Sequence, residues 1–337
     1  MHEIDLRPFR EGSEAGREAV VAAIDAACRD SGFLVLTGHG VDPALCDAVL
    51  DAWHAFFDLP DDEKRRYVVE DYSANIGYSP FGSEALAYTT GVETPPDLME
   101  AFSVAREDVA GREYDSVREW FTPNVWPTHP ADLREVTLAY DAALRDVTDV
   151  VLRAMALALG LPEQWLVERN ERAVVTLRPL NYERRAGAPE ALPDQQRLGA
   201  HTDFGVMTLL LADEVPGLQV LRNGRWHDVV PRRGTLVCNL GDMLAMWTND
   251  RWTSTLHRVV PPPVDAESSV RRRSLARFVD GDPSVTVTTI PSCCSAENPS
   301  RYEPVQAGEW LLAKIVGNRA GEVPDLPGAG LTSAATR

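Results

Sequence analysis

The chain has 337 residues, of which 44% are hydrophobic and 25% charged, a composition typical of a globular protein. Its formal net charge of −18 repels phosphate backbones and anionic lipid, which argues against nucleic acid and membrane surfaces as partners. No apolar run approaches the roughly 20 residues of a transmembrane helix, and the first ten residues lack the apolar stretch of a secretory signal.

The cysteines indicate the cellular compartment. There are five of them, an odd number, and no C-x-x-C pair occurs. Cys293 and Cys294 are adjacent, which is poor geometry for an ordinary disulfide. We therefore expect reduced thiols and a cytoplasmic protein. Separately, we expect the protein to be a monomer.

The first half of the chain is predicted to be mainly helical. In the first helix Val20, Ile24 and Ala27 fall at helical spacing. Asp42 is a predicted N-cap, with Pro43 at the first helical position after it. The predicted helices cover residues 12–31, 43–57, 61–68 and 132–159, and a short apolar strand is predicted at 33–36.

The segment from Glu70 to Pro127 shows no sustained period and is rich in Gly, Pro, Ser and Thr. Irregular segments of this length in a compact chain are usually functional. We therefore expect lid segments here.

The second half consists of short β-rich runs. Turn signals such as Asn223-Gly224 and Arg233-Gly234 separate them. Many short strands without intervening helices favour a sandwich, jelly roll or barrel. The predicted strands cover residues 173–180, 198–203, 206–211, 217–221, 226–229, 235–239, 255–260, 272–279 and 284–288, and a final helix is predicted at about 307–316.

These elements predict one domain over residues 1–320, because no convincing linker divides them. A helical N-terminal region, 1–127, would pack on a β-core at 173–290. Residues 321–337 are rich in Gly, Pro, Ala and Thr and are expected to form a flexible tail.

The triplet His201-Thr202-Asp203 ends one predicted strand, and His257 lies in a later one. Side chains two apart on a strand point to the same face, so His201 and Asp203 can present an imidazole and a carboxylate to one point. Two histidines and one carboxylate are the facial ligand set of non-haem iron(II) oxygenases, which leaves coordination positions open. Taken alone, the triplet is more often a solvated or capping pair than a ligand pair, and His257 is more often a core histidine. The joint pattern is more specific.

A candidate carboxylate anchor follows at Arg272-Arg273-Ser274. The same spacing puts Arg272 and Ser274 on one face, where a guanidinium fork and a hydroxyl can hold a carboxylate. The alternative is a solvated basic run in a hairpin. The order of the motifs, with the anchor after the three metal ligands, favours the anchor.

Together these motifs resemble those of the isopenicillin N synthase-like group of iron(II)/2-oxoglutarate oxygenases, over residues 4–318. The segments that carry the resemblance are SGFLVLTGHGV at 31–41, GYSPFGSE at 77–84, DLMEAF at 97–102, LRPLNY at 177–182, HTDFG at 201–205, GLQV at 217–220, NLGDM at 239–243, LHRV at 256–259 and RRS at 272–274.

The resemblance implies an α/β protein with a mainly β core, a double-stranded β-helix or jelly roll, flanked by N-terminal, central and C-terminal helices. It implies Fe(II) at His201, Asp203 and His257, with 2-oxoglutarate as co-substrate and dioxygen as oxidant. Arg272 and Ser274 would hold the distal carboxylate of 2-oxoglutarate.

Tyr182 or Asn181 would support the co-substrate. Many family members carry Asn-Tyr-Tyr-Pro where this chain has Asn181-Tyr182-Glu183-Arg184, so the role of a second tyrosine is unfilled or moved.

The expected function is oxidation of an unactivated C–H bond of a small molecule, by hydroxylation, desaturation or cyclisation. The usage of Ala, Arg and Asp resembles that of a high-GC bacterium, which favours a role in biosynthetic, secondary metabolism. The side chains expected to line the substrate pocket are Tyr78, Phe81, Tyr88, Phe102, Phe204 and Met207.

Two alternatives remain open. An iron(II) enzyme of the same fold could hold its substrate's own carboxylate at Arg272 and Ser274, without 2-oxoglutarate. A jelly roll without catalytic activity could bind a small acid or a partner. A dinucleotide site at Gly38-His39-Gly40 is disfavoured, because Pro43 stands where the third glycine belongs.

Overall fold

The computed structural model describes residues 1–71, 74–87, 94–107, 122–183, 192, 195–262 and 271–320, and for 316–320 it describes the backbone alone. Within this part of the chain, no helix combines the length and the apolar character needed to cross a membrane. All five cysteines are free, as predicted.

Two β-sheets form the core. The large sheet contains, in spatial order, β1 (His2–Asp5), β2 (Phe33–Thr37), β10 (Leu236–Leu240), β7 (Met207–Ala212), β12 (Arg272–Gly281), β5 (Val174–Tyr182), β4 (Glu100–Ala105) and β3 (Gly77–Ser79). The small sheet contains β6 (Leu198–His201), β11 (His257–Val259), β8 (Leu218–Arg222) and β9 (Arg225–Asp228). A two-stranded sheet pairs β13 (Thr286–Val287) with β14 (Val305–Gln306). The large and small sheets enclose a pocket between them, which confirms the predicted jelly roll.

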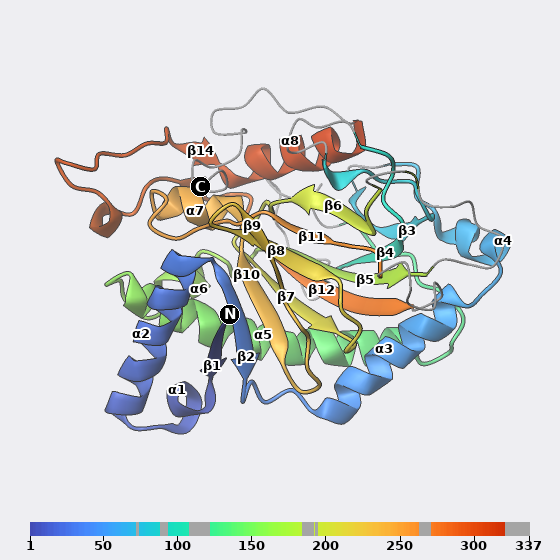
Figure 1. The fold of residues 1–337 in the computed structure, drawn as a ribbon, viewed down its shortest axis with the longest axis horizontal. Helices are drawn as coiled ribbons and strands as arrows, with labels where there is room; N and C mark the ends of the chain where they lie inside the picture. The colour runs from blue at the N-terminus through green and yellow to red at the C-terminus, as the bar shows by residue number, and fades with distance from the viewer. Residues whose placement is uncertain are drawn as a thin grey trace.

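The helices cover this core from both sides. Helices α3 and α5 run along the outer face of the large sheet, whereas α8 lies on the opposite side, near β6 and β11 (Figure 1). The helices are α1 (Arg7–Glu11), α2 (Glu14–Asp30), α3 (Pro43–Phe57), α4 (Asp61–Lys64), α5 (Leu133–Ala158), α6 (Trp165–Glu168), α7 (Asp242–Trp247) and α8 (Ala307–Ala320), with 3₁₀ turns at Arg65–Tyr67 and Pro291–Cys293.

Local sequence signals predicted the long helices well. The Asp42 side chain accepts a hydrogen bond from the backbone N–H of Ala44 at 2.9 Å, and Pro43 opens α3, as expected of an N-cap followed by proline. The Asn223-Gly224 turn also forms as predicted between β8 and β9. Both residues have positive φ, 50° and 69°, which is the backbone that a two-residue hairpin requires.

The first half contains more strands than the sequence predicted: the strand expected at 33–36 forms as β2, whereas β1, β3 and β4 were not expected. Strands β1 and β2 from this half pair in parallel with each other, and β2 pairs with β10. Strand β4, inside the segment expected to be irregular, pairs with β5 from the second half. Strands β1 and β4 are short, and their pairing partners lie far away in the sequence, so a local pattern did not reveal them.

Strand β12 is buried on both faces, one of which lines the pocket while the other packs against helices. Its residues alternate between the pocket and the outer face that α3 and α5 cover. On the outer face, Arg277 donates from Nε to Asp141 Oδ1 at 2.8 Å and from Nη1 to Thr148 Oγ1 at 2.9 Å, both on α5. The hydrogen-bonded ion pair fixes the position of α5 against the sheet.

A second buried ion pair joins the N-terminal segments to the sheet. Lys64 is 0% exposed, and its Nζ donates to Glu100 Oε2 at 2.6 Å and to the carbonyl of Phe57 at 3.2 Å. Glu100 also accepts hydrogen bonds from the Tyr78 hydroxyl and from Asn181 Nδ2. The network connects α4 with three strands of the large sheet.

Replacing Lys64 by methionine should lower the free energy of unfolding by about 3–5 kcal/mol, because the Glu100 carboxylate would remain buried without its cation. Urea unfolding measures this change. Arg65→Met, at an exposed neighbouring position, is the control and should cost far less. Equal losses for the two variants would show that the ion pair does not contribute.

Candidate metal centre and pocket

The pocket is lined by alternate residues of two paired strands. Arg272 pairs with Tyr182 and Ser274 with Leu180 across the β12–β5 ladder. Because side chains two apart point to the same face, one face of each strand supplies the pocket wall. The residues on this wall are Thr176, Arg178, Leu180 and Tyr182 of β5, and Arg272, Ser274, Ala276, Phe278 and Asp280 of β12.

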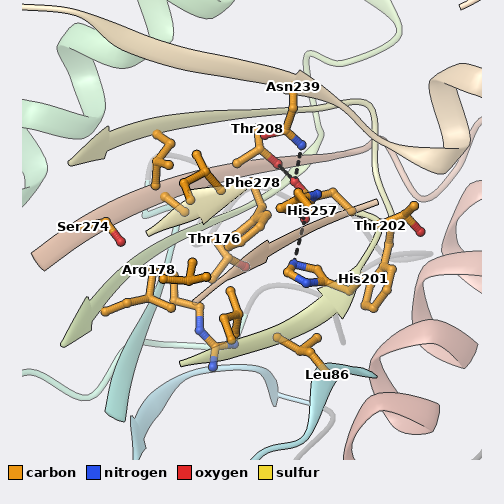
Figure 2. Close-up of a pocket in the computed structure, with 18 of the residues that line it drawn as sticks. Leu86, Thr176, Arg178, His201, Thr202, Thr208, Asn239, His257, Ser274 and Phe278 are labelled. Carbon is orange, nitrogen blue, oxygen red and sulfur yellow. Dashed lines mark hydrogen bonds and ion pairs between the residues drawn. The ribbon is translucent and has the colours of Figure 1, made fainter. Parts of the chain in front are cut away.

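The small sheet brings the three predicted metal ligands together. His201 ends β6 and His257 begins β11, and the two are direct antiparallel partners. Asp203 Oδ1 lies 3.8 Å from His201 Nε2 and 3.7 Å from His257 Nε2. All three residues are buried, and their ligand atoms lie within 4.8 Å of one another, a group that could hold one metal ion. Figure 2 shows His201 and His257 close together at one end of the pocket and Ser274 toward the other end.

One detail of the prediction changes. The strand was expected to include Asp203 but ends at His201, so Asp203 lies in the loop that follows. The chain still turns the carboxylate toward the two imidazoles. Their convergence therefore depends on the loop conformation as well as on strand alternation.

Backbone carbonyls set the tautomers of both histidines. His201 Nδ1 lies 2.7 Å from the carbonyl oxygen of Gly199, and His257 Nδ1 lies 3.1 Å from that of Thr255. Because a carbonyl can only accept, each Nδ1 must carry the proton. Each Nε2 then keeps a lone pair directed at the shared point, which is the arrangement that metal-binding histidines use.

Two side chains hold the carboxylate in place. Asp203 Oδ2 accepts a hydrogen bond from Thr208 Oγ1 at 2.5 Å and from Asn239 Nδ2 at 2.6 Å. Both donors come from strands of the large sheet, β7 and β10. They leave Oδ1 facing the imidazoles. Sequence reasoning did not identify these two residues, because their role depends on contact between the two sheets.

The protonation states of His201 and Asp203 at neutral pH are those that metal binding requires. Burial, with the neighbouring His257, lowers the pKa of His201 to about 4. Burial by itself would raise the pKa of Asp203, but His257, His201 and the hydrogen bonds from Thr208 and Asn239 together hold the pKa below its ordinary value. At neutral pH, therefore, His201 is neutral and Asp203 is ionised, as metal ligands must be.

Arg272 lies at the other end of the wall and is 1% exposed. Its Nη1 donates to Ser274 Oγ at 3.1 Å, and its guanidinium lies 5.1 Å from the centre of the Tyr182 ring. Its Nε and Nη2 are buried and have no hydrogen-bond partner among the described residues. A buried guanidinium with unused donors is costly unless an anion binds it, and a carboxylate fits its fork.

The structure does not bring all predicted co-substrate residues together. Tyr182 lines the pocket beside Arg272, and burial raises the pKa of its hydroxyl. Asn181 lies on the opposite face of β5. Its side chain donates to Glu100 at 2.8 Å and accepts from Arg271 Nε at 2.5 Å, so it is outside the pocket wall.

Of the aromatic and sulfur-containing side chains expected around the substrate, only Phe204 lines the described pocket. Tyr78, Phe102 and Met207 are buried in the hydrophobic core, where Phe102 packs against Trp53. Phe81 is 43% exposed at the surface. Tyr88 lies outside the described residues.

Three further polar residues, on the wall formed by β5 and β12, escaped the sequence analysis: Thr176, Arg178 and Asp280. Arg178 donates from Nη2 to both carboxylate oxygens of Glu84 at 2.6 Å. The alternation that identified Arg272 and Ser274 extends along both strands and would have placed all three on the same wall. The missing information was which strand pairs with β12.

The site as a whole belongs to a defined chemical class. Two histidine nitrogens and one carboxylate oxygen face a pocket whose far end carries the buried Arg272. This donor set is that of non-haem iron(II) oxygenases, with coordination positions left open.

Comparison with known proteins identifies the family. A family model described as the N-terminal part of the non-haem dioxygenases of morphine synthesis matches residues 3–129. A model of the 2OG-Fe(II) oxygenase superfamily matches residues 179–281. The chain belongs to the 2-oxoglutarate/iron(II) oxygenase family. It is a 2-oxoglutarate-dependent dioxygenase, an oxidoreductase whose cofactors are Fe(II), 2-oxoglutarate and dioxygen.

Individual relatives support this assignment over nearly the whole chain. A 2-oxoglutarate-Fe(II) type oxidoreductase of Emericella nidulans is 35% identical, covering 91% of this chain and 87% of its own length. A homoarginine-6-hydroxylase of Oryza sativa subsp. japonica is 32% identical, covering 89% of each. A full-length Neurospora crassa protein crystallised in complex with alpha-KG superposes with a TM-score of 0.82 at 30% identity, covering 94% of this chain and 95% of that one.

Replacing Asn239 by alanine should weaken divalent metal binding about 10- to 100-fold, because Asp203 loses one of the two donors that orient it. Calorimetric titration with manganese(II) measures the affinity. Asn298→Ala, which removes an asparagine side chain that bonds to the Cys293 carbonyl away from the pocket, is the control. Unchanged metal affinity in the Asn239 variant would contradict the orienting role.

Proposed function

We propose that this enzyme oxidises an unactivated C–H bond of a small molecule, with iron held by His201, Asp203 and His257. The observation that carries the proposal is the convergence of three buried ligand atoms at one point beside the pocket. The donor set fits iron(II), since imidazole nitrogen and carboxylate oxygen in a facial arrangement are its preferred protein ligands in oxygenases.

We further propose that Arg272 and Ser274 anchor the distal carboxylate of 2-oxoglutarate. The two unpaired buried nitrogens of Arg272 support this assignment, since they supply donors and positive charge that no described residue uses. Tyr182 packs beside the guanidinium and restricts its position. The anchor residues and the three metal ligands line the same pocket, as one diacid bound to both requires.

The protein's own contribution to the reaction is orientation and the exclusion of water. The carbonyls of Gly199 and Thr255 keep the ligand nitrogens unprotonated and directed at the metal. Phe204, with Leu311 and Ile315 of α8, forms an apolar side of the pocket. When bound, iron with 2-oxoglutarate and dioxygen supplies the chemistry that breaks the C–H bond.

The product type follows from the position of the target carbon, so hydroxylation, desaturation and cyclisation are all within this chemistry. The rice relative is named as a hydroxylase of homoarginine, a small polar molecule. This supports a small-molecule substrate and a role in biosynthetic, secondary metabolism.

Arg272→Ala should raise the KM for 2-oxoglutarate about 100-fold, because a buried, charge-assisted contact is lost. The assay is iron-dependent formation of succinate, with and without added substrates. Arg273→Ala is a matched control, because Arg273 faces outward and donates to Asp51 at 3.1 Å. An unchanged KM in Arg272→Ala would refute the anchor, and turnover that consumes no 2-oxoglutarate would favour an anchor for the substrate's own carboxylate.

His201→Ala should abolish iron-dependent succinate formation while the far-ultraviolet circular dichroism spectrum stays that of the native protein. The reason is the loss of one of three protein ligands at the metal. Full activity in this variant would refute the ligand assignment. Absence of succinate formation in the native protein, under any condition, would favour a binding protein without catalysis.

A further inference from the structure

Asp280 is a buried acidic side chain of the pocket wall that the proposed chemistry does not use. It is 7% exposed and lines the pocket, on the same face of β12 as Phe278 and Ser274. Its carboxylate makes no hydrogen bond or ion pair with any residue that the structure describes. Burial and the neighbouring Asp203 carboxylate raise the pKa of Asp280 to about 7, so its charged form needs a compensating group to be stable near neutral pH.

A β-bulge in β12 positions the Asp280 carboxylate. The β12–β5 register shifts between Val279 and Gly281, so Asp280 is the extra residue of a bulge, a feature that redirects a side chain. The segment packs closely on the loop after the metal motif. A Cβ on Gly205 would lie 2.4 Å from Asp280 Cα and 2.5 Å from its Oδ1, so only glycine permits this approach.

The basic side chains of the surrounding elements are committed to other acids. Arg178 binds Glu84. Lys314 of α8 lies 3.5 Å from Asp242, and Arg172 lies 2.9 Å from Asp282. Arg277 faces the other side of the sheet and binds Asp141. None of these side chains neutralises Asp280.

The bound cofactors do not neutralise it either. A ferrous ion, the Asp203 carboxylate, the doubly charged 2-oxoglutarate and the Arg272 guanidinium have charges that cancel. The Arg178–Glu84 pair is also neutral. With both cofactors in place, an ionised Asp280 would therefore be the remaining net charge of the described pocket wall.

The surroundings of Asp280 suit an organic cation. Phe278 shares its face of β12 two residues away, and Phe204 lines the pocket directly before Gly205. Aromatic faces attract cations. Val174 pairs with Gly281, next to Asp280, and clusters with Leu311 and Ile315 of α8, which gives apolar surface for a hydrocarbon segment.

We propose that the substrate carries a positively charged nitrogen, an ammonium or guanidinium group, that binds Asp280 between the metal loop and α8. This inference rests on the proposed function, since it names the substrate class of the same pocket. Asp280 binds and orients the substrate in this scheme and takes no part in the oxidation.

The test uses matched probe pairs that differ in charge: butylguanidinium against butylurea, and benzylamine against benzyl alcohol. Calorimetry measures their binding to the anaerobic protein loaded with Fe(II) and 2-oxoglutarate. We expect each cation to bind about tenfold more tightly than its neutral partner, as for a desolvated charge pair. Asp280→Asn should reduce this preference to less than about twofold while keeping its affinity for 2-oxoglutarate.

Glu214→Gln is the control, because it removes the same charge from an exposed position outside the pocket and should keep the preference. Thermal unfolding of the ligand-free protein gives a second measurement. If Asp280 serves binding, Asp280→Asn should raise the midpoint by about 2 °C, since it removes an unpaired buried charge. If it serves the fold, the midpoint should fall.

Equal binding within both probe pairs, or a preference that survives Asp280→Asn, would overturn this inference alone, provided that 2-oxoglutarate still binds. Failure of the native protein to bind 2-oxoglutarate would overturn the proposed function and this inference with it.

Discussion

The convergence of His201, Asp203 and His257 is the constraint on which the rest of the structure depends. Two imidazole nitrogens and one carboxylate oxygen lie within 4.8 Å of one another in a buried site. Such a cluster is favourable only under two conditions. The ring nitrogens that face the shared point must be unprotonated, and a cation must be able to balance the carboxylate. The carbonyls of Gly199 and Thr255 meet the first need, and the donors Thr208 and Asn239 hold Asp203 ready for the second.

Both sheets are needed to build this site. The small sheet supplies the two histidines as direct partners on neighbouring strands, whereas the large sheet supplies the side chains that orient the carboxylate. The large sheet also carries Arg272, the anchor that we propose for 2-oxoglutarate. Because β12 alternates between the pocket and α5, the same strand that presents Arg272 and Ser274 inward is fixed from outside through Arg277 and Asp141. Rigid support and chemical function therefore share one element.

Unbalanced charge distinguishes the pocket from the core around it. In the core outside the pocket, Lys64 pairs with Glu100 and Arg277 with Asp141. In the pocket, Arg272 keeps two unused nitrogens, and Asp280 has no partner among the described side chains. Such unpaired groups lower the stability of the fold, and a protein can retain them where a bound ligand supplies the missing partner. In our proposals, these unpaired groups are the places where the 2-oxoglutarate carboxylate and a cationic substrate bind.

The sequence by itself determined the features that depend on local chemistry. Capping at Asp42, the turn at Asn223 and the H-x-D and R-x-S spacings follow from residues close together in the chain, and the structure contains each of them. Only the tertiary structure decided that β4 joins the large sheet, that Asn181 faces away from the pocket and that Asn239 holds Asp203. It also decided that Asp280 has no partner among the residues that the structure describes. These features depend on contacts between segments far apart in the chain, which no local period encodes.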